Sequence, residues 1–274
     1  MESIPFNSNL LAERFRPIFI FDKQEQYFPC SVNYLINNSQ LYNGEELVTD
    51  FGKTSVEDLS DNKGDRLIFA KESYNGDLQN APVYYNIRVC EQFIDIVYIL
   101  FFAYNGPLNV LGLFEVGEHT GDIEHVIVRL NKSNLSLNSV YFSAHNDEGE
   151  WVDKSNVKTI QLRNDENVFE HPMVYVARNS HAMYASEGTH YRIFGIVNDH
   201  CSTYKGSMLN DLIEVKECDK NETHWIHYNG SFDGVSCLPH RDWWTESPVY
   251  DSSVLTRLFP WYFIYQQFRK VHRF

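Results

Sequence analysis

The segment GEHTGDIEHVIVRL, residues 117–130, places His119, Asp122 and Glu124 at the start of a strand-like pattern. These three residues carry one imidazole and two carboxylates. Beyond them, apolar residues fall on alternate positions with the same parity as Glu124, namely Val126, Val128 and Leu130. This alternation is typical of a half-buried strand, so it turns Glu124 toward the core. Because an uncompensated buried carboxylate costs several kcal/mol or more, Glu124 needs a partner or a wet environment.

A divalent cation is one partner that would satisfy this requirement. The pattern H-x-x-D-x-E formed by His119, Asp122 and Glu124 contains Thr120-Gly121, which permits a sharp turn that swings the imidazole toward the carboxylates. Oxygen-rich coordination with a single imidazole suits Mg, Ca or Mn, whereas Zn sites usually contain more His or Cys. We therefore expect one Mg, Ca or Mn ion at these three residues.

An arginine is the alternative partner. Glu124 could pair with Arg129 or Arg178, in which case His119 only forms a hydrogen bond within a turn. Spacing alone leaves both interpretations open.

Further polar residues follow other strand-like runs and are candidates for binding a ligand. His145 ends one such run, and the strand MVYVA is followed by the polar cluster Arg178-Asn179-Ser180-His181. Asn198 and Asp199 come shortly after GIV and form either an Asx turn or part of the same site. Ligands are usually met at the ends of strands, so we name His145, Arg178, His181 and Asp199 as ligand-binding candidates. The alternative for any single histidine is an ordinary satisfied or exposed side chain.

Standard catalytic signatures are missing from the sequence. It contains no G-x-S-x-G, Walker A, H-E-x-x-H or C-x-x-C pattern. A metal-assisted hydrolase with His145 or His181 as general base would need an open coordination position and a base within reach of it. Enzymatic activity is therefore left open, with binding favoured.

Composition excludes some classes of function. The net charge is −14, the pI is near 5.2, and no block of Lys and Arg stands out, which argues against nucleic-acid binding. The five cysteines are odd in number and widely spaced, and the first residues lack a secretory signal, so we expect an intracellular, cytoplasmic protein. The longest apolar stretch, residues 93–104, is too short for a transmembrane segment and predicts a strand buried on both faces.

Short strand-like runs separated by turn residues dominate the chain from residue 83 onward. We predict an all-β fold, an antiparallel, jelly-roll-like β-sandwich with peripheral helices, in a single domain spanning 1–274. Within it, 1–82 is an N-terminal segment whose part 49–82 is a polar loop, 83–234 is the sandwich core, and 235–274 is an aromatic and basic tail. Helical spacing predicts a C-terminal helix beginning near Pro260.

The aromatic tail admits two roles. It either closes one end of the sandwich as a helix or docks onto a protein partner, as would the stretch RDWWTESPVY at 241–250. Docking is the basis of an alternative function, a structural or interaction protein within a sorting complex or a virus particle.

Five motifs in order resemble the Vps62 family, also called the plant DUF946 family, across about residues 15–240. They are GEHTGDIEHVIVRL, VYFSAHNDEGEWV, HPMVYVARNSHAMYASEGTHY, GIVND and WIHYNGSFDG. The resemblance implies an association with vacuolar protein sorting and no defined activity.

The first motif is also similar, more distantly, to the G-H-R-H-D-W-E heptapeptide of the necrosis- and ethylene-inducing cytolysins. That resemblance implies a β-sandwich that binds a divalent cation and recognises sphingolipid head groups. Carried over by position, the metal ligands are His119, Asp122 and Glu124, the nearest candidate for an upstream aspartate is Asn105, and a later essential histidine falls at His181. Together these observations lead us to expect a cation-containing binding module for a glycan or lipid head group.

Overall fold

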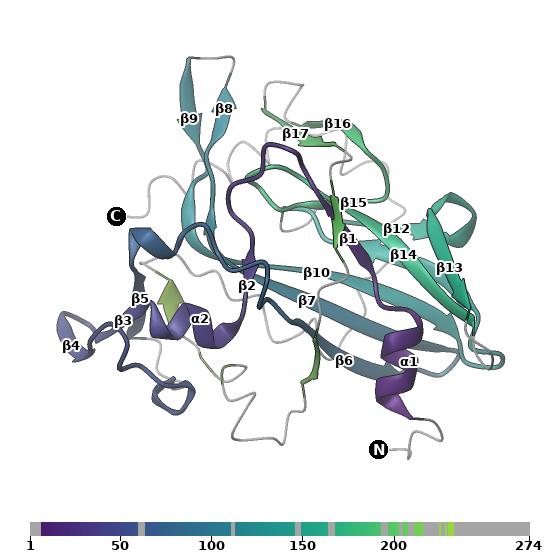
Figure 1. Cartoon of the computed structure of the whole chain (residues 1–274), viewed down its shortest axis with the longest axis horizontal. Coiled ribbons are helices and arrows are strands. Elements are labelled where there is room, and N and C mark those ends of the chain that lie inside the picture. Colours follow the sequence, from purple (N-terminus) through teal and green to yellow (C-terminus); the bar gives the residue numbers. More distant parts are fainter. Residues whose placement is uncertain are drawn as a thin grey trace.

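The computed structural model shows three layers built around one central sheet (Figure 1). It describes residues 7–59, 64–110, 113–145, 149–163, 168–192, 197–202, 205–207, 211–215, 225, 228 and 230–232. The central sheet has seven strands, in the order β12 (Glu150–Asp153), β11 (Leu137–Phe142), β10 (His119–Asn131), β7 (Phe93–Asn105), β6 (Val83–Val89) and β19 (Leu212–Glu214), with β2 (Pro29–Cys30) also paired to β7.

A five-stranded sheet covers one face of the central sheet. Its order is β13 (Thr159–Arg163), β14 (Val168–Val176), β1 (Ile18–Phe21) and β18 (Lys205–Ser207), with β15 (Met183–Tyr184) beside β14 and helix α1 (Ser8–Arg14) in contact with β14. Alternate residues of β7 and β10, such as Tyr98 and Val126, pack between the two sheets against Phe19 and Val174. This packing forms the larger hydrophobic core.

The opposite face of the central sheet is covered by different elements. These are helix α2 (Val32–Asn37) and a four-stranded sheet in the order β20 (Ser231–Phe232), β5 (Asp65–Phe69), β3 (Ser39–Asn43) and β4 (Glu46–Thr49). Val97 and Ile99 of β7 point into this second core, beside Leu35 and Leu67. Strand β7 is therefore buried on both faces, as its sequence, apolar apart from Asp95 over most of its length, predicts.

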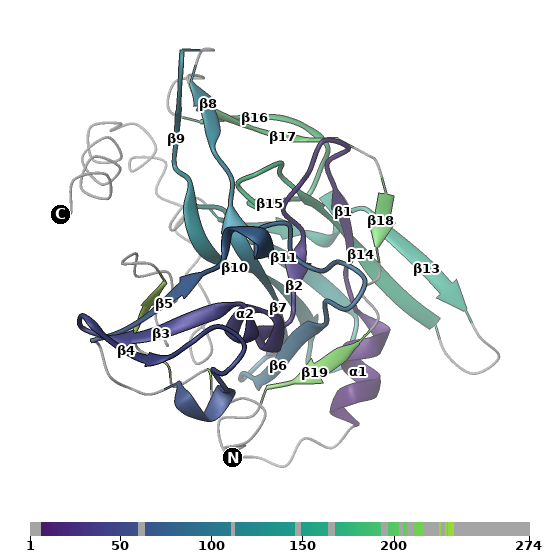
Figure 2. The ribbon, with the colours of Figure 1, turned by 60° about the vertical axis from the view of Figure 1, so that its left-hand side comes forward.

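Two hairpins extend from one end of the layers. Strands β8 (Leu108–Val110) and β9 (Phe114–Val116) form one, β16 (Gly188–Arg192) and β17 (Val197–Cys201) form the other, and β8 contacts β17. Both lie at the top of the molecule in Figures 1 and 2. Three short 3₁₀ turns complete the described elements: η1 (Val56–Asp58), η2 (Lys71–Ser73) and η3 (Lys154–Asn156).

The predicted all-β sandwich is confirmed, with two differences in detail. Parallel pairing joins β1 to β14, β19 to β6 and β20 to β5, so the sheets are mixed. The apolar island within the expected polar loop 49–82 forms β5, which buries Leu67 and Phe69 against the central sheet. The helix predicted from Pro260 lies outside the described residues. Among the helices that are described, none has the length and apolar character needed to cross a bilayer.

A buried ion pair fixes the register of three central strands. Asp95 of β7 is fully buried and lies opposite Arg88 of β6 and Arg129 of β10. Arg129 donates two hydrogen bonds of 2.8 Å to this carboxylate, and Arg88 donates a third at 3.4 Å. The Arg129 guanidinium also lies 4.1 Å from the ring centre of Trp151. A shift of any one strand by one residue would separate these charges.

Replacing Asp95 with alanine tests this arrangement. Asp95→Ala leaves two largely buried arginines without their shared carboxylate, so we expect the free energy of unfolding to fall by about 3 kcal/mol. Urea unfolding measures this change, with the exposed Glu91→Ala, from the turn before β7, as the control. Equal stabilities of the two variants would show that the triad contributes nothing to the fold.

Candidate functional site

Glu124 is buried on the core face of β10, as its parity predicts. It is 9% exposed and lies on the same face as Val126 and Val128. The Ser143 hydroxyl, just after β11, donates a short hydrogen bond to its carboxylate. The same hydroxyl accepts a hydrogen bond of 3.1 Å from the backbone N–H of His125.

Both arginines that were proposed as partners of Glu124 bind other residues. Arg129 points to the opposite face of the sheet and binds Asp95, while Arg178 donates to the amide oxygen of Gln24. The Ser143 hydroxyl, which follows the neighbouring strand β11, therefore supplies one donor to Glu124.

Asp122 faces a fully buried histidine across the gap between the two large sheets. Its Oδ2 accepts a hydrogen bond of 3.0 Å from Nδ1 of His181, and Nε2 of His181 lies 3.0 Å from the backbone carbonyl of Tyr27. The imidazole also stacks on Phe102 of β7, with ring centres 3.8 Å apart. Both ring nitrogens face acceptors, so both contacts are hydrogen bonds when the ring carries two protons. His181 therefore links Asp122 to the backbone of Tyr27.

The electrostatic environment keeps Asp122 ionised. Burial raises the pKa of its carboxyl, but the hydrogen bond from His181 and the nearby imidazoles of His119, His181 and His145 more than offset that effect. The pKa of Asp122 therefore lies below its ordinary value. Three of the histidines predicted from the sequence thus act on one carboxylate.

The expected turn at Thr120-Gly121 is not a separate turn, which corrects our prediction. β10 runs without interruption from His119 to Asn131, and Thr120 pairs with Tyr104 of β7. Gly121 has φ +64°, and a Cβ atom there would lie 2.5 Å from the Phe232 ring, so only glycine fits. Strand β10 pairs with β7 on both sides of Gly121, at Thr120 and at Asp122, so the strand continues past this unusual backbone conformation.

His119 and Asn105 are direct neighbours across β10 and β7. Nδ1 of His119 lies 3.0 Å from the carbonyl oxygen of Gly121. The Asn105 amide is buried and donates to the carbonyls of Gly106, at 3.1 Å, and Gly117, at 3.0 Å. Asn105 thus lies beside the first of the three expected metal ligands, while its amide NH₂ stabilises the start of the β8–β9 hairpin.

The described residues do not form a ready metal site. Within them, no three His, Cys, Asp or Glu side chains are gathered closely enough to hold a metal ion. Asp122 is paired with His181, and Glu124 accepts from Ser143. The divalent cation expected at His119, Asp122 and Glu124 stays a prediction.

A second buried carboxylate, Asp199 of β17, gathers donors from three other segments. It accepts hydrogen bonds from Nε2 of His145 at 2.7 Å, from the Ser180 hydroxyl at 2.7 Å and from the Tyr184 hydroxyl at 2.6 Å. Burial raises its pKa, but the bond and charge of His145, the charge of Arg192 and the bond from Tyr184 hold the pKa well below the usual range. Asp199 therefore connects β17 to the ends of β11 and β14.

The segment Arg178–His181 connects both carboxylates to the molecular surface. Ser180 and His181 point inward to Asp199 and Asp122, while the preceding Arg178 and Asn179 line a cleft. Asn179 and His181 have positive φ values of 66° and 55°, which L-residues seldom adopt. The hydrogen bonds on every residue of the segment hold this backbone in place.

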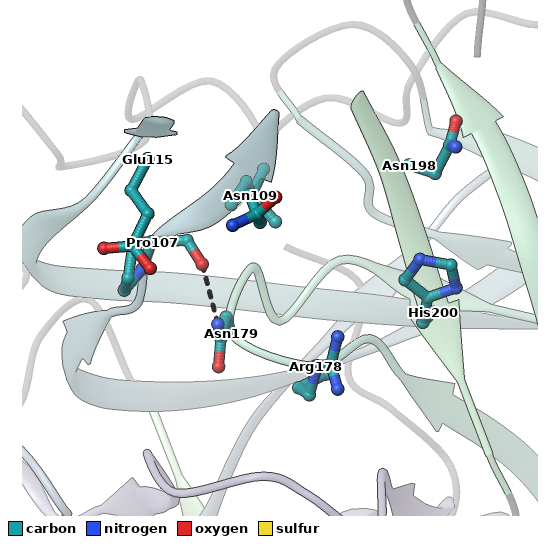
Figure 3. Close-up of a pocket in the computed structure, with 8 residues that line it drawn as sticks. Pro107, Asn109, Glu115, Arg178, Asn179, Asn198 and His200 are labelled. Atoms are coloured by element: carbon teal, nitrogen blue, oxygen red, sulfur yellow. Dashed lines mark hydrogen bonds between the residues drawn. The ribbon is translucent and has the colours of Figure 1, made fainter. Parts of the chain in front are cut away.

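The cleft has a volume of about 290 Å³ and lies between the two hairpins. Figure 3 shows Arg178 and Asn179 between β8–β9 residues on one side and β17 residues on the other. The Asn179 amide donates to the Pro107 carbonyl at 2.7 Å, and the Arg178 N–H donates to the His200 carbonyl at 3.0 Å. The residues that line the cleft are Pro107, Leu108, Asn109, Glu115, Arg178, Asn179, Asn198 and His200.

Gly106 allows the cleft to form. A Cβ atom at this position would lie 2.4 Å from the Tyr27 ring and 3.0 Å from the side chain of Asn179. Its N–H donates to the Asn179 carbonyl at 2.9 Å. The absence of a side chain therefore lets β8 start directly against the loop that carries Arg178 and Asn179.

Sequence reasoning placed part of this arrangement and missed the rest. Arg178 lines the cleft, whereas the other candidates, His145, His181 and Asp199, lie behind it as buried supports. The cleft residues that the sequence analysis did not name are Pro107, Leu108, Asn109, Glu115 and His200. Strand parity could have indicated His200, because Asp199 points inward and its neighbours must point outward.

The fold and the cleft together define a layered β-sandwich with a polar concavity at one end. A family model described as "Vacuolar protein sorting-associated protein 62" matches residues 3–207, which is most of the chain. The chain therefore belongs to the Vps62 family.

Two curated relatives come from Saccharomyces cerevisiae. Vacuolar protein sorting-associated protein 62 is 24% identical over 210 residues, covering 64% of this chain and 44% of the relative. Putative vacuolar protein sorting-associated protein TDA6 is 24% identical over 176 residues, covering 54% and 37%. The chain thus matches less than half the length of each relative.

Similar solved structures include necrosis- and ethylene-inducing proteins. Necrosis and Ethylene inducing Protein 2, from the causal agent of cocoa's Witches Broom disease, has a TM-score of 0.43 at 12% identity, covering 85% of this chain and 88% of that one. NLPPya in complex with glucosamine has a TM-score of 0.41 at 13% identity, covering 81% and 82%.

The pKa of Asp122 leads to a prediction about acid stability. Because its pKa is lower in the folded protein than in the unfolded chain, ionised Asp122 stabilises the fold above about pH 4, its ordinary pKa, and this contribution is lost as the pH falls through the folded value. Asp122→Asn lacks this contribution. We expect the difference in unfolding free energy between wild type and variant to shrink steadily as the pH falls below about 5.

Urea unfolding at a series of pH values measures this difference. The exposed Glu72→Gln serves as the control, and its difference from wild type should not change with pH. A constant difference for Asp122→Asn would mean that the ionised carboxylate does not stabilise the fold.

Proposed function

We propose that this Vps62-family chain is a binding module that recognises a polyhydroxylated ligand, a glycan or the polar head group of a lipid, in the cleft beside Arg178. The observation that carries the proposal is the cleft itself, a polar concavity whose central residues are held by two buried carboxylates.

The chemistry of the lining suits hydroxyl groups. The amides of Asn109, Asn179 and Asn198 each offer both a donor and an acceptor, and Arg178 adds a planar set of donors. Glu115 supplies an acceptor on the opposite wall. A sugar hydroxyl both donates and accepts, so a lining of this mixture can pair several hydroxyls at once.

Size and rigidity also support a small polar ligand. Ligand sites commonly enclose about 300 to 1,000 Å³, and this cleft lies at the lower end of that range, enough for one or two sugar-sized rings. Arg178 and Asn179 belong to a segment whose backbone is hydrogen-bonded at each residue, so binding requires little further ordering of the protein.

The family relationship suggests where such binding is used. Both curated yeast relatives carry names that refer to vacuolar protein sorting. We propose that head-group recognition by this domain serves a sorting pathway inside the cell. A divalent cation at His119, Asp122 and Glu124 would be an addition to this function, and elemental analysis of protein purified without chelator tests for it.

Cleft variants test the proposed ligand class. Calorimetric titration or a glycan array with neutral, amino and acidic monosaccharides, together with vesicles containing glycosylated lipids, should identify a binding member of the panel. Asn109→Ala removes one donor and one acceptor from the lining, so we expect it to weaken binding about tenfold while the free energy of unfolding stays unchanged.

The control is Asn156→Ala, an exposed asparagine on η3 outside the cleft. It should bind the same ligand as wild type does. If no member of the panel binds, or if Asn109→Ala and Asn156→Ala bind alike, the cleft is not the recognition site.

A further inference from the structure

We infer that the outer edge of β4 is a docking surface for the C-terminal segment of this same chain, residues 254–274. This inference concerns a different face from the cleft and does not rest on the proposed function.

The β4 edge combines exposed apolar side chains with negative charge. Leu47, Val48 and Phe51 are 45%, 52% and 44% exposed. β4 is the last strand of the four-stranded sheet, so its outer backbone edge has no neighbouring strand among the described residues. Glu45, Glu46 and Asp50 flank these apolar residues. Exposed apolar strands at a sheet edge are usually covered by another segment or partner.

The C-terminal segment complements this surface in both respects. Residues 254–274 contain four Lys or Arg and no Asp or Glu, although the whole chain has a net charge of −14. They also contain seven aromatic residues: Phe259, Trp261, Tyr262, Phe263, Tyr265, Phe268 and Phe274. A basic, aromatic segment matches an acidic surface that exposes apolar groups.

Chain connectivity brings the two together. The last described residue, Phe232, lies in β20, which belongs to the same four-stranded sheet as β4 (Figures 1 and 2). Three strand spacings separate β20 from β4, about 14 Å in all. Residues 233–253 are long enough to cover this separation, because a chain of that length can reach up to about 70 Å. The tethered segment therefore has a high effective concentration at β4, which favours binding within one chain.

Other exposed apolar sites fit this segment less well. Ile160 and Leu162 of the edge strand β13 are 38% and 48% exposed, but Lys158 and Arg163 flank them and would repel a basic segment. Leu113 and Phe114 belong to the β8–β9 hairpin, which is a separate sheet from that of β20. Of the β4 edge, the β13 edge and the β8–β9 hairpin, only the β4 edge both has acidic flanking residues and belongs to the same sheet as β20.

Charge exchange in the full-length chain tests the inference. Replacing Arg269, Lys270 and Arg273 with glutamate should release the segment and raise hydrogen–deuterium exchange in residues 45–51 about tenfold, with no change in residues 159–163. Replacing Glu45, Glu46 and Asp50 with lysine should do the same. Combining both sets restores opposite charges, so protection should return.

The control exchanges three exposed cations elsewhere, Lys23, Lys154 and Arg163, for glutamate, and exchange in residues 45–51 should stay at the wild-type level. Unchanged exchange in all variants, or no recovery in the combined variant, would overturn the inference. Protection that depends on protein concentration would also overturn it, because a second copy of the chain would then cover β4.

Discussion

The buried imidazole of His181, in contact with the carboxylate of Asp122, links distant segments at the end of the protein that carries the cleft. His181 reaches Asp122 on the central sheet and the Tyr27 carbonyl between β1 and β2, while its ring stacks on Phe102. Three segments far apart in the sequence therefore meet at one side chain. Removing either side chain would leave the other buried without its hydrogen-bond partner, which costs more than the loss of a contact at the surface.

The cleft exists because the residues next to this pair have no freedom to move. Ser180 donates to Asp199 and His181 contacts Asp122, and these contacts help to hold the positive φ values of Asn179 and His181, which L-residues seldom adopt. The same constraint presents Arg178 and Asn179 on the outer side. Ser180 and His181 face the buried carboxylates, while Arg178 and Asn179 of the same loop face the cleft. The fixed backbone at the buried residues therefore sets the position of the residues that line the cleft.

Both carboxylates of β10 contact polar groups of the protein. Ser143 donates to Glu124, and His181 pairs with Asp122, although the spacing of these acids suggested a bound cation. Both solutions satisfy the same physical demand, since a carboxylate beside an apolar core needs either a positive charge or hydrogen-bond donors. The Asp95 triad meets that demand in a third way, with two arginines on the opposite face of the same sheet.

Local patterns were sufficient to predict the strands, the all-β class and the inward orientation of Glu124. The reason is that the alternation of inward and outward side chains along a strand depends only on neighbouring residues. They also indicated His145, His181 and Asp199 as polar residues at strand ends. Only the tertiary structure decided what these residues contact. The side chains described above as partners of Glu124, Asp122 and Asp199 come from positions 15 to 59 residues away, and the cleft combines two hairpins that no sequence spacing relates. Long-range pairing is set by how sheets stack, so partner identity and the shape of the cleft were beyond what the sequence alone determines.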